Sequence, residues 1–110
     1  MESNEFKKAE AFNFNHEVDY ANGSIVSKLI LKKTSGNVTL FSFDKGQSLS
    51  EHTAPFDALI QVIEGNAEIL IDQKSYFLKT DESIIMPANI PHAVKAPEKF
   101  KMILIMIKSN

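Results

Sequence analysis

Short runs of apolar and β-forming residues, separated by turn residues, follow one another from residue 23 to the end of the chain. No segment of useful length carries the apolar repeat of an amphipathic helix. The regular spacing of the runs predicts an all-β sandwich or barrel. The predicted strands are 24–31, 38–43, 58–63, 67–71, 74–78, 83–86, 92–94 and 100–107.

Turn-forming residues lie between these runs, in segments 35–37, 44–46, 64–66 and 72–74. The last segment is typical of a short hairpin, with Gln73 at a position where glycine would be more comfortable. Pro87 and Pro91 flank a loop that cannot belong to a central strand. His92 is therefore predicted to begin a strand just after a rigid turn.

The last predicted strand is apolar at even and odd positions alike, from Met102 to Ile107. Successive side chains of a strand point to opposite faces, so both faces of this strand must be covered. One face would fill the barrel, and the other is expected to pack on a second subunit around a two-fold axis. The sequence therefore predicts a homodimer.

The N-terminal residues 1–20 are mostly polar, with scattered aromatic residues at Phe6, Phe12, Phe14 and Tyr20. This pattern is typical of an arm that packs through its aromatic side chains, and the arm could lie across a partner subunit. We therefore expect an arm over 1–20 and a β-barrel domain over 21–110. His16 lies in the arm and is expected at the surface or an interface.

Length and composition restrict the function further. A chain of 110 residues fits one domain. The net charge of −2 and the dispersed Lys and Arg residues indicate neither a nucleic-acid partner nor an anionic membrane. The absence of cysteine excludes disulfides, thiolate metal sites and a cysteine nucleophile. No signal-like run begins the chain, and 102–107 is far too short to span a membrane, so we expect a cytoplasmic protein.

Two segments carry glycine, histidine and proline residues at a recognisable spacing: Gly46, His52 and Gly65 in the first, Pro87 and His92 in the second. Over residues 36–107 the chain resembles the cupin family, whose motifs are written G(X)5HXH(X)3-4E(X)6G and G(X)5PXG(X)2H(X)3N. The resemblance implies a small single-domain cupin, an all-β jelly-roll barrel or double-stranded β-helix.

Five positions depart from those motifs, three in the second segment and two in the first. Asp81 and Asn89 replace glycines, a mild change because Asp and Asn tolerate left-handed turns, and Ala96 replaces the final asparagine. Ala54 and Ala58 replace the second histidine and the glutamate of the first motif. In cupins that second histidine and that glutamate hold a metal together with two further histidines, which correspond to His52 and His92 in this chain.

The resemblance implies that His52 and His92 are metal ligands. One divalent ion, Zn, Ni, Fe, Mn or Cu, would then complete its coordination with water or substrate. Glu51 and Asp57 point outward unless Pro55 shifts the strand register, so neither is expected to add a carboxylate ligand. The alternative is that no metal is bound and that the histidines are hydrogen-bonding residues of a pocket.

Strand alternation predicts a largely apolar pocket with two imidazoles. The proposed ligand-binding residues are His52, Ala54, Ala58, Ile60, Met86 and His92. Further lining is expected from Phe41 or Phe43, Val62, Val94 and some of Met102, Leu104 and Met106. Phe56 is expected either to cover the pocket mouth or to anchor packing. Asn89 either bonds a ligand or only forms a turn.

Several functions remain open at this point. The first is a cupin that binds a small, weakly polar molecule without catalysis, with His52 and His92 as hydrogen-bonding partners. The second is a mononuclear metal-dependent enzyme of the dioxygenase, isomerase or decarboxylase type, acting on a small organic substrate. A third is a structural partner whose barrel only supports a dimer surface. The sequence does not name the ligand.

Overall fold

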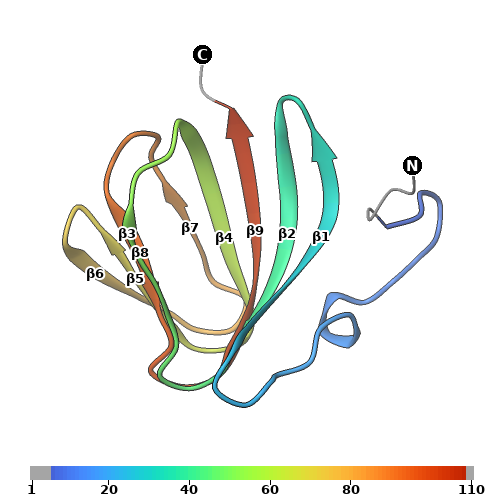
Figure 1. Cartoon of the computed structure of the whole chain (residues 1–110), viewed down its shortest axis with the longest axis horizontal. Coiled ribbons are helices and arrows are strands. Elements are labelled where there is room, and N and C mark those ends of the chain that lie inside the picture. The colour runs from blue at the N-terminus through green and yellow to red at the C-terminus, as the bar shows by residue number, and fades with distance from the viewer. Residues whose placement is uncertain (1–5, 109–110) are drawn as a thin grey trace.

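The computed structural model describes residues 6–108, which form two antiparallel sheets facing each other (Figure 1). The five-stranded sheet has the order β1-β2-β9-β4-β7 and the four-stranded sheet the order β3-β8-β5-β6. The strands are β1 (Ile25–Lys33), β2 (Gly36–Phe43), β3 (Ser48–His52), β4 (Phe56–Gly65), β5 (Ala67–Ile71), β6 (Lys74–Leu78), β7 (Ser83–Met86), β8 (His92–Lys95) and β9 (Phe100–Lys108). The all-β class is confirmed.

The predicted strands agree closely with the observed ones, and three of them coincide with β5, β6 and β7. The apolar pattern does not predict β3, because four of its five residues are exposed. β3 lies at the edge of its sheet and pairs only with β8. None of the helices in residues 6–108 is long and apolar enough to cross a membrane.

Turn conformations agree with the sequence at several positions. Asp72 and Gln73 both have positive φ, 50° and 68°, as the tight hairpin between β5 and β6 requires. Asp81 and Asn89 are also left-handed, with φ of 72° and 63°. At Gly65, φ is +82° and an added Cβ would lie 2.4 Å from the Lys99 carbonyl oxygen. Glycine is therefore required at residue 65 for its conformation and for its lack of a side chain.

The main core lies between the two sheets. Phe43 and Phe100 stack at 4.6 Å between ring centroids, and both are fully buried. Val62, Ile69 and Met102 pack in the same cluster and are also fully buried. Burial of large apolar side chains is the main favourable term in folding, so this cluster holds the two sheets together.

A second apolar cluster covers part of the outer face of the five-stranded sheet. Val18 packs there with Ile30, Leu40 and Ile103, and Phe14 lies against them. Figure 1 shows the N-terminal segment running along the outer side of β1 and β2. The sequence predicted that a second subunit would cover this face of the last strand. Residues of the same chain cover Ile103, while Ile107 at the other end of the strand is 61% exposed, so the homodimer stays a prediction. The boundary that we placed at residue 20 also stays a prediction.

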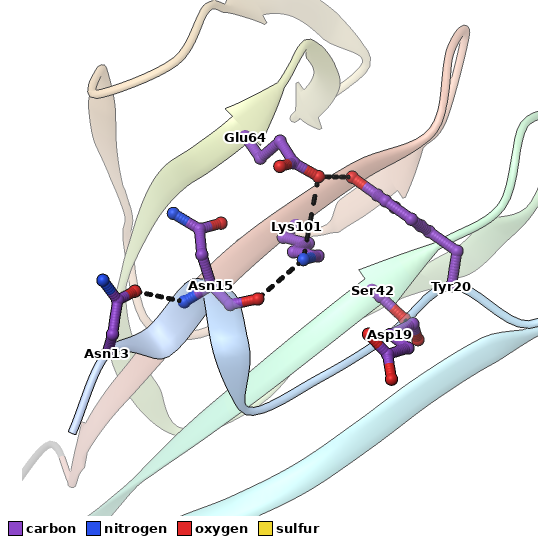
Figure 2. A network of polar contacts seen from close by, with 7 residues as sticks. All are labelled: Asn13, Asn15, Asp19, Tyr20, Ser42, Glu64 and Lys101. Carbon is purple, nitrogen blue, oxygen red and sulfur yellow. Dashed lines mark hydrogen bonds and ion pairs between the residues drawn. The ribbon is translucent and has the colours of Figure 1, made fainter.

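Polar contacts fasten this N-terminal segment to the sheet (Figure 2). The buried Lys101 of β9 donates a hydrogen bond from Nζ to the Asn15 carbonyl oxygen at 2.8 Å and lies 3.7 Å from the Glu64 carboxylate. The Tyr20 hydroxyl donates to that same carboxylate. Burial of Tyr20 and its bond to Glu64 raise the pKa of the phenol. The Ser42 hydroxyl of β2 donates to the Asp19 carbonyl oxygen at 2.8 Å. Three neighbouring strands of the sheet, β2, β9 and β4, are thus tied to the segment.

Candidate functional site

A cavity lies between the two sheets, and apolar side chains form most of its wall. Its volume is about 50 Å³. That is room for roughly four water molecules. Two histidines and ten apolar residues line it: His52, His92, Leu49, Ala54, Phe56, Ala58, Ile60, Met86, Val94, Met102, Leu104 and Met106.

The structure brings the residues of the sequence-predicted site together. All six residues proposed for ligand binding lie in the cavity wall, although their role in binding stays a prediction. The prediction that Val62 and Phe43 line the cavity is wrong, because both are fully buried in the core and lie outside the cavity wall. Phe41 also packs against that core. Phe56 lines the cavity, and Leu49 is a lining residue that the sequence reasoning missed.

A β-bulge in β3 explains how Leu49 and His52 both reach the cavity. Leu49 pairs with Val94 and His52 pairs with His92, so two residues of β3 lie opposite the single residue Ala93. In a regular strand, residues three positions apart point to opposite faces. The extra residue restores a common face for both side chains. The bulge is therefore what places His52 directly across from His92.

The two imidazole rings are in contact. Their centroids lie 4.4 Å apart with an interplanar angle of 66°. His92 is buried, with 7% of its surface exposed, whereas His52 is exposed. The pair thus extends from the cavity wall to its mouth, so a bound molecule can meet both rings without entering the core.

Each ring uses one nitrogen to bond the backbone. His52 Nδ1 lies 2.8 Å from the Ser50 carbonyl oxygen, and His92 Nδ1 lies 3.1 Å from the Ile90 carbonyl oxygen. A carbonyl only accepts hydrogen bonds, so Nδ1 carries the hydrogen and Nε2 keeps the lone pair in each neutral ring. Within residues 6–108, Nε2 of neither ring has a hydrogen-bond partner. Both rings are held in place with an acceptor nitrogen still available.

The nearest acidic residues in the sequence do not join the histidines. The Asp57 carboxylate accepts a hydrogen bond from the Ala88 backbone nitrogen at 2.9 Å and so braces the loop before His92. Asp57 and Glu51 are both exposed, while Ala58 is buried. The expected outward direction of these carboxylates is confirmed, and Pro55 does not reverse the register.

The loops that carry the two histidines are joined at the mouth. The Asn89 backbone nitrogen donates a hydrogen bond to the Ala54 carbonyl oxygen at 2.8 Å. The left-handed conformation of Asn89 confirms the turn expected at this residue. The third histidine, His16, lies in the short 3-10 helix Phe14–His16 and is exposed, outside the cavity wall.

The donor set does not fit a metal held by the protein alone. Residues 6–108 contain no group of three or more His, Cys, Asp or Glu side chains that could hold an ion. Protein zinc sites use three or four protein ligands, and the open iron sites of oxygenases use two histidines and a carboxylate. Ala54 and Ala58 stand in the wall where further donors would be needed.

Comparison with known proteins identifies the fold and the family. A family model described as a cupin domain, Cupin_2, matches residues 39–108. The polyketide synthase CurC of Streptomyces cyaneus is 26% identical over 70 residues, which are 63% of this chain and 46% of that protein. The chain therefore spans less than half the length of this curated relative.

Solved structures are similar over nearly the whole chain. A conserved protein of unknown function from Streptococcus pyogenes is 36% identical with a TM-score of 0.91, covering 97% of this chain and 94% of that one. A cupin 2 conserved barrel domain protein from Leptotrichia buccalis is 46% identical with a TM-score of 0.86, covering 88% of this chain and 47% of that one. The predicted jelly-roll barrel, a double-stranded β-helix, is confirmed by these matches.

Proposed function

The chain belongs to the cupin family, and we propose that its barrel binds a small molecule with a mostly apolar body whose polar end contacts His52 and His92. The composition of the cavity wall carries this proposal, since ten of its twelve lining residues are apolar and the other two are these histidines. Small-molecule sites typically combine an apolar wall with a few polar groups that set orientation.

The size of the cavity supports a small ligand. A cavity of about 50 Å³ accepts a body of a few carbon atoms. This volume is well below that of a pocket for a drug-sized ligand. The exposed His52 lies at the mouth, where the polar end of the ligand can remain partly hydrated. Ala54 and Ala58 contribute to this space, because each leaves only a methyl group in the wall.

The metal-dependent enzyme is the weaker candidate. Two imidazoles supply fewer donors than a resident zinc or iron ion requires. No carboxylate, lysine or tyrosine lies in the cavity wall to act as a general base beside the histidines. We therefore propose that binding of a small molecule, and not metal-dependent catalysis, is the function.

A thermal-shift screen with small neutral fragments tests the proposal. A fragment present at ten times its Kd adds about 1.4 kcal/mol of stability, which raises Tm by roughly 6 °C in a domain of this size. We expect such shifts with the native chain and not with Ala58→Leu, which fills the cavity from its wall. His16→Ala is the matched control, because that histidine lies outside the wall. Equal shifts in Ala58→Leu and the native chain would contradict the proposal.

We also propose that the chain forms a homodimer through the outer face of its five-stranded sheet. Ile85 and Ile107 are 63% and 61% exposed there. The half-buried Leu59 and Ile105 lie between them, since Ile85, Leu59 and Ile105 are register partners across β7, β4 and β9. Exposed apolar rows of this kind favour a protein contact. Light scattering should give a dimer mass at micromolar concentration, and a monomer mass would overturn the proposal. Cytoplasmic localisation stays a prediction.

A further inference from the structure

The two histidines have the same ring nitrogen left for a ligand. Because both Nδ1 atoms donate to backbone carbonyls, Nε2 is the atom through which each neutral ring can accept a hydrogen bond. Rotating either ring to exchange its nitrogens would break the bond to Ser50 or Ile90 and leave a carbonyl without that donor. The backbone therefore sets the hydrogen-bonding character of the pair.

No charged residue in the wall can neutralise a charged ligand. The lining contains neither Lys or Arg for a carboxylate nor Asp or Glu for an ammonium group. Transfer of an unpaired ion from water into an apolar site is costly. A carboxylate faces the further disadvantage that it is an acceptor opposite two acceptors. A neutral donor group has neither problem.

We infer that the site selects small neutral molecules that end in a hydrogen-bond donor with two hydrogens on one atom, such as a primary carboxamide, over carboxylates of the same shape. The distance of 4.4 Å between ring centroids allows one NH2 group to approach both rings. This inference rests on the proposed function, which gives the site a ligand, and adds the chemical class of that ligand.

The methionines offer a direct readout of the cavity. Three of the four methionines of the chain, Met86, Met102 and Met106, line it. In protein carrying 13C-labelled methionine methyl groups, these signals report occupancy of the cavity. We would titrate the full chain at pH 8 with four probes that share the same three-carbon isopropyl body: isobutyramide, N,N-dimethylisobutyramide, isobutanol and isobutyrate.

Isobutyramide is expected to shift the cavity methionine signals at the lowest concentration. Loss of one hydrogen bond should weaken its binding roughly fivefold to tenfold in His52→Ala or His92→Ala. The His16→Ala control should bind as the native chain does. N,N-dimethylisobutyramide has no N–H, so it should bind the native chain no more tightly than isobutyramide binds His52→Ala or His92→Ala. Isobutyrate should cause no shift.

The outcomes separate the inference from the proposed function. Equal binding of all four probes, or tighter binding of isobutyrate than of isobutyramide, would overturn the donor selectivity while leaving a small-molecule site. No shift with any probe would overturn both. A 15N spectrum of the histidine rings in the free protein gives an independent check. Hydrogen on Nδ1 of His52 and His92 is expected, and hydrogen on Nε2 of either ring would contradict the inference.

Discussion

Replacement of Met102 by alanine should cost more stability than the same truncation at Leu104 or Met106, the other two cavity residues of β9. Met102 lies in the middle of the barrel in β9 and has no exposed surface. Truncation of a fully buried methionine removes its apolar contacts and leaves a void that the surrounding sheets fill only in part. The expected loss is about 3 kcal/mol.

The same strand provides matched controls. Leu104 and Met106 point to the same cavity but are only half-buried, because they lie closer to its mouth. Their truncation leaves a space that is continuous with solvent, so less contact energy is lost. Leu104→Ala and Met106→Ala should each cost about 1.5 kcal/mol. The predicted order follows from the direction in which the cavity opens.

Urea unfolding followed by far-UV circular dichroism measures these losses, since the chain has no tryptophan for fluorescence. A loss of about 3 kcal/mol should also lower Tm by roughly 15 °C. Equal losses for the three variants would refute the idea that the cavity closes at Met102 and opens beyond Met106. A loss below about 1 kcal/mol for Met102→Ala would refute its place in the core.

Four further variants test how the chain positions the site and the arm. Gly65→Ala should lower the free energy of unfolding in urea by about 3 kcal/mol. Gly46 is also left-handed but has open space around it, so Gly46→Ala should cost only about 1 kcal/mol. Equal costs would show that the close approach of the Lys99 carbonyl does not matter. Because the pKa of Tyr20 is raised in the folded protein, the folding stability that its neutral phenol contributes is fully present below about pH 10. This contribution is lost as the pH rises further. Tyr20→Phe should therefore lose less stability than the native chain between pH 9 and pH 11, and parallel losses would contradict this. Asp57→Ala removes the acceptor for the Ala88 nitrogen and should cost about 1 kcal/mol, with a neutral result showing that the brace is not needed.

Much of the fold is predictable because the sequence carries local signals for it. Apolar runs and turn residues locate all the strands except β3. The spacing from Gly46 to His92 predicts that the two histidines meet, and their rings are 4.4 Å apart. Asp81 and Asn89 adopt the left-handed conformation expected where the cupin motif has glycine. Short segments contain the information for the strands and turns, whereas the meeting of the histidines follows from the spacing of two motifs.

The remaining features depend on contacts between distant segments. β3 is short and mostly exposed, so it has no apolar repeat to reveal it. Its bulge, which turns Leu49 toward the cavity, depends on pairing with β8. The aromatic residues of the N-terminal segment indicate packing but do not say on which surface. Nothing in the sequence distinguishes Lys101 from an ordinary exposed lysine, although it is buried and donates a hydrogen bond to the Asn15 carbonyl oxygen.

A crystal structure of the full chain saturated with isobutyramide tests the central claim most directly. The account predicts density for the isopropyl group against Met86 and Met106, with the amide nitrogen about 3 Å from Nε2 of both His52 and His92. Density for the probe outside the barrel, or an ion bridging the two imidazoles in place of the amide, would contradict it.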